Sequence, residues 1–238
     1  SNIPEARLLL DGQEIPTRKF DGIIFGKANI TAKAPAGYVF KGWNLISNSA
    51  EQNALIPFRS TWQYYDKGSL HGTGWNAQGH TASNWKSGKA PFGYGTVGTT
   101  ANAADYYTTI DYGGDPNKKR PTYYFRKTFT LTEEPSYEDR FYIHYYLDDG
   151  ALFYINGTEV GGYHCNSGVS YDDFSTTHEG NTAAYGTIEI PATVLQKGSN
   201  VITVEVHNTS FTSSDIFFDA KVEKAKFKPT FLGNKETI

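Results

Sequence analysis

The sequence has almost no sulfur, little net charge and no long apolar run. Cys165 is the only cysteine among 238 residues, which excludes an internal disulfide and a zinc site built on Cys-x-x-Cys pairs. The formal net charge is −3, and the longest basic run is KKR at 118–120. Without a basic patch or an apolar run of about 18 residues, we expect neither a nucleic-acid partner nor membrane insertion.

A methionine and a secretory leader are also lacking. The sequence contains no Met and opens with SNIPEA, and no segment with the charged and apolar regions of a signal peptide follows. We therefore expect this chain to be a piece of a larger protein whose export signal lies elsewhere.

Aromatic residues and glycine are plentiful. The chain has 17 Tyr, 15 Phe, 4 Trp and 24 Gly, a mixture that favours short strands and many turns over helices. Four segments, 122–131, 140–147, 200–208 and 215–223, alternate apolar and polar residues as half-buried strands do. The apolar residues expected to face the core are Tyr123, Phe125, Phe129, Leu131, Phe141, Ile143, Tyr145, Leu147, Ile202, Val204, Val206, Ile216, Phe218, Ala220 and Val222. Lys127 falls on the same face of the first segment, and Val201 is the alternative to the Ile202 face in the third.

The only helical signal is one turn within 191–198, so these strands predict an all-β, antiparallel sandwich of the jelly-roll type. We divide the chain into a small β unit with a linker at 1–57, the sandwich at 58–225 and a C-terminal tail at 226–238 that frays or lies along the N-terminal unit. In the small unit, Asp11-Gly12 and Asp21-Gly22 are typical of tight hairpin turns.

Two resemblances extend this interpretation. ITAKAPAGYVFKGW (30–43) resembles a recurrent β-repeat of bacterial surface proteins, which implies a spacer whose core is Tyr38, Phe40 and Trp43. NWKSGKAPFGYG (84–95), YYFRKTF (123–129), LDDGALFYINGTEV (147–160), GSNVITVEVHN (198–208) and SSDIFFDAKV (213–222) resemble, in order and spacing, a galactose-binding-domain-like sandwich. That module accompanies secreted bacterial enzymes and surface proteins, including those with CotH-like or lamin-tail domains. The resemblance implies an extracellular or cell-surface location, but the fold hosts sugar binding, protein binding and structural roles alike.

The adjacent carboxylates of Asp148 and Asp149 are interpreted as part of a turn. Neighbouring residues of a strand point to opposite faces, so the two carboxylates cannot flank one glycosidic bond. The DDG at 148–150 and the ING at 155–157 fit two successive turns, in which Gly150 and Gly157 take conformations that are costly for other residues. A calcium loop is the alternative. No cofactor is required, but the resembled sandwiches often hold a structural calcium, which here would fall on Asp148, Asp215 or Asp219, although no EF-hand spacing occurs.

Two candidate catalytic groups have structural alternatives. Glu205 and His207 share one strand face about 7 Å apart and could act as acid and base, with Asp215 as a third member of a hydrolase site. The favoured interpretation is a polar patch beside Arg126, His144 or Asp215, because no nucleophile motif lies near them. Cys165 beside His164 is interpreted as part of a surface loop, since adjacency in sequence does not activate a thiol.

Sugar binding needs exposed rings with carboxylates, amides or hydroxyls around them. Trp62 and Trp85 are expected to be core residues, and a sheet face with Tyr142, His144 and Tyr146 is the alternative site. The loop residues expected to bind a ligand are Trp75, His80, Tyr163, Asn166, Tyr171, Asp172 and Asp173.

The sequence therefore predicts a monomeric, non-catalytic carbohydrate-binding accessory module of a larger secreted or surface bacterial protein. The alternative is a structural module that packs its Tyr-rich face on a neighbouring domain, and a hydrolase using Glu205, His207 and Asp215 is less favoured.

Overall fold

The computed structural model of the chain describes residues 6–15, 28–40, 42–46, 51–95, 98–99, 106–136, 139–177, 182–226 and 229–233. The chain forms two compact units, one of Glu51–Lys226 and one of Ser1–Ala50 with Phe227–Ile238. Within the described ranges every regular element is a strand except the single 3-10 turn η1 (Ala192–Val194). None of these elements is a helix with the length and apolar character that crossing a membrane requires.

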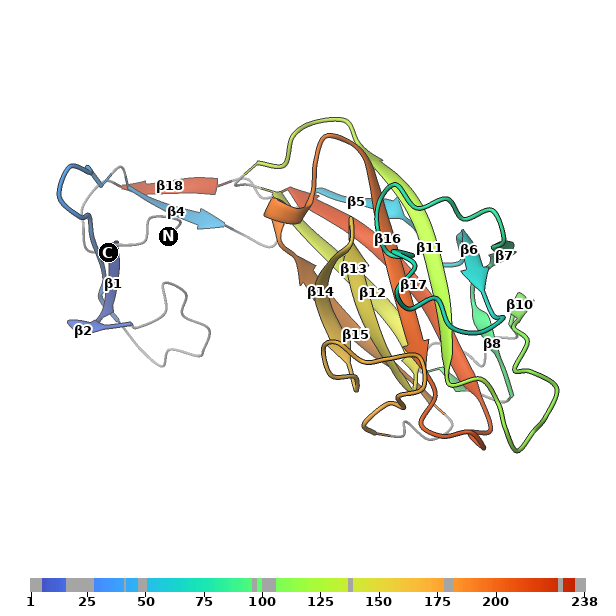
Figure 1. The fold of residues 1–238 in the computed structure, drawn as a ribbon. Helices are drawn as coiled ribbons and strands as arrows, with labels where there is room; N and C mark the ends of the chain where they lie inside the picture. Colours follow the sequence, from blue (N-terminus) through green and yellow to red (C-terminus); the bar gives the residue numbers. More distant parts are fainter. Residues whose placement is uncertain are drawn as a thin grey trace. The chain divides into compact units, whose positions relative to one another are not determined.

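The larger unit is a β-sandwich of two sheets, as the alternating strands predicted (Figure 1). The seven-stranded sheet has the order β10-β8-β17-β12-β15-β9, and β5 also pairs with β17. Its strands are β5 (Glu51–Ile56), β8 (Phe92–Tyr94), β9 (Gly98–Thr99), β10 (Thr108–Thr109), β12 (Asp139–Asp148), β15 (Thr182–Ile190) and β17 (Ile216–Lys226). The six-stranded sheet has the order β14-β13-β16-β11-β6-β7. Its strands are β6 (Thr61–Tyr65), β7 (Lys86–Lys89), β11 (Thr122–Leu131), β13 (Gly150–Ile155), β14 (Thr158–Tyr163) and β16 (Gly198–His207).

The core lies between the two sheets, where the predicted apolar faces of the long strands meet. All fifteen apolar residues expected to face inward from β11, β12, β16 and β17 belong to one buried cluster, which confirms those faces, while Lys127 on the same face of β11 is only half-buried. Phe125 of β11 and Phe218 of β17 join the sheets with ring centroids 4.4 Å apart, and Trp62 contacts Phe218 at 5.4 Å. Because this core packs the two sheets against each other, it fixes the positions of their outward-facing side chains.

The DDG segment carries the chain from one sheet to the other. β12 ends at Asp148 in the seven-stranded sheet, and β13 begins at Gly150 in the six-stranded sheet, so this turn is not a hairpin. Gly150 does not need a positive φ; a Cβ there would lie 2.7 Å from the Ser175 Cβ and 2.8 Å from the Cys165 Sγ. The hairpin is the next turn, where Asn156 (φ 51°) and Gly157 (φ 88°) join β13 to β14.

The smaller unit contains a three-stranded sheet and a two-stranded one. β1 (Arg7–Leu10), β2 (Gln13–Glu14) and β3 (Ile30–Lys33) have the order β2-β1-β3, and β4 (Trp43–Ile46) pairs with β18 (Pro229–Gly233). Asp11 and Gly12 make the predicted turn with positive φ, whereas Asp21-Gly22 lies outside the described residues.

The expected aromatic core of this unit needs one correction. Phe40 and Trp43 pack edge to face at 5.3 Å, but Tyr38 is 56% exposed because the residues around it form a turn at the surface.

Candidate functional site

The outer face of the six-stranded sheet is covered by residues 66–85, called here the covering loop, which joins β6 to β7. Figure 1 shows this teal segment passing across β11 and β16. Arg126, on the outward face of β11 and only 4% exposed, donates hydrogen bonds to the carbonyls of Trp75 (3.3 Å), Ala77 (3.0 Å) and Gln78 (2.7 Å). The planar guanidinium can reach three carbonyls at once, so one side chain holds the middle of the loop.

Further contacts hold the two ends of the covering loop. At its start, the buried Asp66 accepts hydrogen bonds from Lys86 Nζ (2.9 Å) and from the backbone amide of Asp111 (3.0 Å). Near its end, Gln78 Nε2 donates to the carbonyl of Ser199 (2.6 Å). The loop is irregular in sequence but fixed in position, because its backbone is tied to the sheet beneath it.

Trp75 is part of the packing under this loop. Its ring contacts Tyr124 of β11 at 4.8 Å and Tyr154 of β13 at 5.6 Å, and the residue is 5% exposed. The expectation of an exposed Trp75 that stacks on a ligand is therefore corrected: the ring fills the space between the loop and the sheet.

A pocket of ≈ 160 Å³, called here the Trp85 pocket, opens within the covering loop. The rings of Tyr65 and Trp85 lie 6.0 Å apart, and His80 contacts Trp85 edge to face at 6.2 Å. The lining combines these rings with hydroxyl and amide groups and one leucine: Tyr65, Leu70, Thr73, His80, Thr81, Ser83, Asn84 and Trp85.

Two of the lining residues decide what the Trp85 pocket can bind. Trp85 is expected from the sequence to be a core residue, but it is only half-buried and its ring lines the pocket. Burial, and then the nearby charge of Arg126, lower the pKa of His80 below its usual value, so this imidazole is neutral at pH 7. A neutral imidazole both donates and accepts hydrogen bonds, as hydroxylated ligands require.

Glu205 lies beneath the covering loop in a buried hydrogen-bond network, and the buried His207 lies beside it on the same face of β16. Glu205 accepts from Tyr154 Oη (2.5 Å), and its Oε2 lies 3.1 Å from His71 Nε2 and 3.5 Å from His207 Nε2. Burial raises the pKa of Glu205, but the hydrogen bonds from His207 and Tyr154 outweigh it and hold the pKa below its usual value. Because His71 belongs to the covering loop, the network fastens that loop to β16, which is the role of a structural polar patch.

The partners of this patch differ from those expected. Arg126 holds the same loop, whereas His144 lies in the seven-stranded sheet, with its Nδ1 3.0 Å from both Tyr185 Oη and Thr187 Oγ1. Asp215 precedes β17, where Ser214 Oγ donates to its Oδ1 (2.7 Å). Sequence reasoning missed His71 and Tyr154 because they come from other segments, which no strand alternation brings together.

Cys165 lies in a setting that keeps its thiol protonated. Burial, and then the charges of Glu205 and Asp149, raise the pKa of this thiol to about 12. A thiolate is the reactive form, so the structure offers no activation of Cys165 as a nucleophile.

The three aspartates expected to hold calcium lie on or beside the paired strands β12 and β17, where Asp148 is in register with Phe217. Asp148 ends β12, Asp215 precedes β17, and Asp219 lies within β17, where its carboxylate accepts a hydrogen bond from the Arg59 amide (3.1 Å). Across the described ranges, no three His, Cys, Asp or Glu side chains form a group that could hold a metal ion.

The other loop residues expected to bind a ligand lie at the end of β14 and beyond it. Tyr163 ends β14 and stacks on His164 at 3.9 Å, and Asn166 lies in the following irregular segment. The carbonyl of Tyr171 accepts a hydrogen bond from Thr122 (2.6 Å). Asp172 is exposed, and Asp173 accepts hydrogen bonds from Ser170, which lower its pKa. Of the seven expected residues, only His80 lines the Trp85 pocket.

The outer face of the seven-stranded sheet carries a chain of five aromatic rings, called here the aromatic band. Successive centroid distances are 6.1 Å from Tyr142 to His144, 6.3 Å to Tyr185, 5.1 Å to Tyr146 and 5.4 Å to Phe58. Tyr185, which no expectation included, is 53% exposed. The band contains the Tyr142, His144 and Tyr146 face that the sequence offered as an alternative site.

The comparisons with known proteins found similarity only among solved structures. No family model matches the sequence, and no curated protein matches it. Among solved structures, the chain is similar to part of a Bacteroides uniformis beta-glucuronidase 2, with 18% identity and a TM-score of 0.46 over 74% of this chain and 18% of that one. A Bacteroides vulgatus beta-glycosidase shows 20% identity and a TM-score of 0.40 over 71% of this chain and 20% of that one. An uncultured Clostridium sp. beta-glucuronidase shows 10% identity and a TM-score of 0.43 over 77% of this chain and 30% of that one. The matches therefore span less than a third of each of these enzymes.

Proposed function

We propose that this chain is a non-catalytic carbohydrate-binding module and that the Trp85 pocket takes one sugar residue. The observation that supports this most directly is the lining of the pocket, in which the rings of Tyr65, His80 and Trp85 stand beside hydroxyl and amide groups. Sugar rings present apolar C–H faces that pack on aromatic rings, while their hydroxyls need donors and acceptors around the edge.

The size and rigidity of the pocket agree with this ligand. A volume of ≈ 160 Å³ is well below the roughly 300–1,000 Å³ of pockets for drug-sized molecules, so one ring rather than a longer segment fits inside. The hydrogen bonds from Arg126 to the covering loop, and from Lys86 to Asp66 at the start of that loop, hold the lining in place before a ligand arrives, which reduces the entropy lost on binding. We further propose that the module works as a monomer in a larger secreted or surface bacterial protein, and that binding requires no cofactor.

Replacing Trp85 by alanine is expected to weaken glycan binding at least about tenfold, close to 1.4 kcal/mol, because the stacking ring is lost. Calorimetric titration of the chain against plant, host and bacterial glycans, with and without a chelator, measures the change. Tyr185→Ala is the matched control, since it removes an exposed ring from the other sheet. Equal affinity of Trp85→Ala and the unaltered chain would contradict the site, and loss of binding with the chelator alone would establish a calcium requirement.

A second function is favoured by the aromatic band. Tyr and Phe are enriched at the centres of protein interfaces, and five neighbouring rings around the exposed Tyr185 form such a surface. In this alternative the chain is a docking module whose aromatic band packs on a neighbouring domain of the same protein.

The docking alternative predicts that Tyr185→Ala weakens binding to an adjoining domain of the native protein by about tenfold, while Trp85→Ala leaves that binding unchanged. The measurement is a titration of this chain with separately produced neighbouring domains. The reverse pattern, with Tyr185→Ala silent, would exclude the aromatic band as the docking surface.

A further inference from the structure

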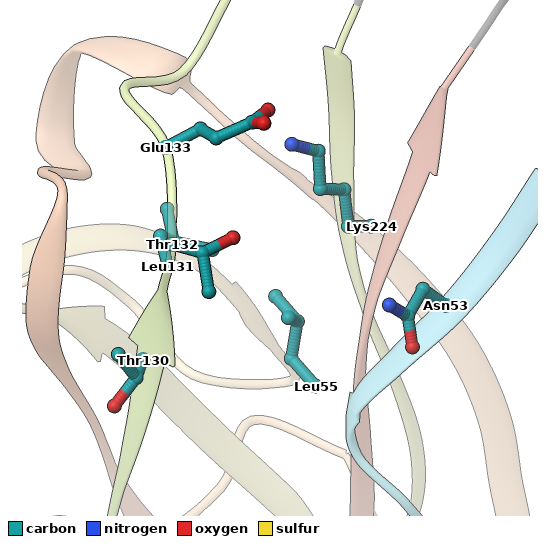
Figure 2. A pocket seen from close by; sticks show the side chains of 7 residues that line it. All are labelled: Asn53, Leu55, Thr130, Leu131, Thr132, Glu133 and Lys224. Atoms are coloured by element: carbon teal, nitrogen blue, oxygen red, sulfur yellow. The ribbon is translucent and has the colours of Figure 1, made fainter.

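A second pocket lies at the end of the sandwich where β11 ends, and its lining is charged. Its volume is ≈ 260 Å³, and its lining comes from β5, β11, β17 and the two residues after β11: Asn53, Leu55, Thr130, Leu131, Thr132, Glu133 and Lys224. Figure 2 shows the carboxylate of Glu133 and the ammonium of Lys224 pointing toward each other, with Leu55 and Asn53 below them on the same pocket.

The charged groups occupy positions where the strand pattern calls for apolar core. On β17, Ile216, Phe218, Ala220 and Val222 face the core, and Lys224 continues that face. On the neighbouring β12, Asp139 likewise continues the face of Phe141.

Lys224 and Asp139 form an ion pair at this end of the core. Lys224 Nζ lies 3.2 Å from Asp139 Oδ1, and the two side chains are 20% and 3% exposed. Burying such a pair has a high desolvation cost and adds little stability compared with an apolar pair. Its presence beside an open pocket therefore points to a role in binding.

The charge balance selects the kind of ligand. One ammonium serves two carboxylates: Lys224 Nζ lies 3.2 Å from Asp139 Oδ1 and points toward the carboxylate of Glu133 (Figure 2). An anion would be repelled by both carboxylates, and a cation would approach Lys224 at close range. A neutral ligand rich in hydroxyls meets neither penalty, because its hydroxyls donate to Glu133 and accept from Lys224 and Asn53, while its apolar face lies on Leu55.

We propose that this pocket is a second binding site, for a neutral polyhydroxylated ligand of the sugar class. The inference rests on the proposed function only for the choice of sugars as the hydroxylated ligand. The two pockets share no lining residue, so the chain would hold two sugar residues independently, and a glycan that reached both would gain avidity from the link between them.

The test is a titration of the isotope-labelled chain with glucose, galactose, mannose and N-acetylglucosamine, followed by two-dimensional NMR. Saturable shifts are expected at the amides of Asn53, Leu131 and Lys224. Glu133→Gln keeps the shape but removes the charge, and it should weaken this response at least about fivefold. Glu134→Gln is the matched control, because Glu134 is the next residue, accepts from the Lys197 amide and does not line the pocket.

Each outcome has a separate meaning. If the sugars shift the signals of the Trp85 pocket alone, the second site is overturned and the proposed function remains. If they shift neither set of signals, both are overturned. Tighter binding of acetate or methylamine than of any sugar would overturn the neutral ligand class. Persistence of the Asn53 and Lys224 response in the Trp85→Ala variant would show that the second site is independent.

Discussion

Replacing Arg126 by methionine is expected to lower the free energy of unfolding by about 3 kcal/mol and to abolish binding at the Trp85 pocket. Hydrogen bonds to a charged group contribute about 1.5–3 kcal/mol each, and Arg126 makes three to the covering loop, although their effects do not add fully. Methionine keeps much of the apolar stem but leaves three carbonyls without their donor. The covering loop would then no longer hold His80 and Trp85 together.

Urea denaturation and glycan titration of the same preparation measure the two losses. Arg126→Lys should recover only part of either, because an ammonium cannot reproduce the planar fork. Arg140→Met is the matched control: its guanidinium lies on the other sheet, 3.8 Å from Glu189 at the surface, where ion pairs contribute about 0–1 kcal/mol. A fully stable Arg126→Met that still binds glycans would show that the loop is held by other contacts.

The fold was largely predictable from the strand alternation, but the burial of the outer face of the six-stranded sheet was not. Alternation correctly placed Phe125 and Val204 in the core, and it placed Arg126 and Glu205 on the opposite face. Polar residues on that face are expected to meet solvent, yet both are buried because the covering loop folds back over them. Periodicity reports local geometry, whereas this burial depends on a segment that comes well before β11 in the chain and has no local signal.

The candidate site was predictable only in outline. The stretch between Thr61 and Gly98 was recognisable as a candidate functional segment from its length and irregularity, and His80 was identified within it. Which tryptophan packs and which lines the pocket could not be determined from spacing: Trp75 is buried against Tyr124, and Trp85 is half-buried beside the opening. Side-chain direction in an irregular loop is set by tertiary contacts, here the carbonyls held by Arg126.

The DDG segment shows a similar limit. Two carboxylates followed by glycine indicated a turn, and a turn is present, but the sequence did not reveal that it connects two sheets. Asp149 Oδ2 accepts a hydrogen bond from the Thr209 amide (2.8 Å), which joins this crossover to the end of β16. Gly150 is needed there because Ser175 and Cys165 approach its backbone, a contact between distant segments.

Replacing Asp219 by asparagine is expected to stabilise the chain at neutral and alkaline pH. Burial raises the pKa of this carboxyl to about 7 from a usual 3.8, and the hydrogen bond from the Arg59 amide offsets only part of that rise. Since the folded state binds the proton more tightly than the unfolded state, the stability due to Asp219 is complete below pH 3.8 and is lost as the pH rises through 7. The asparagine side chain of the variant is neutral throughout, so its advantage should grow to about 4 kcal/mol by about pH 8.

Asp139→Asn provides a control with the opposite sign. Burial raises the pKa of Asp139, but the hydrogen bonds from Ser136 and Lys224 outweigh it and hold the pKa below 3.8. The folded state therefore favours the ionised form, and the variant should be less stable than the unaltered chain at about pH 7, with a difference that shrinks as the pH falls below 3.8. Urea denaturation of both variants between about pH 2 and 8 measures the two trends. An Asp219→Asn advantage that did not change with pH would mean that shape rather than charge sets its effect, because only an ionising carboxyl links stability to proton binding.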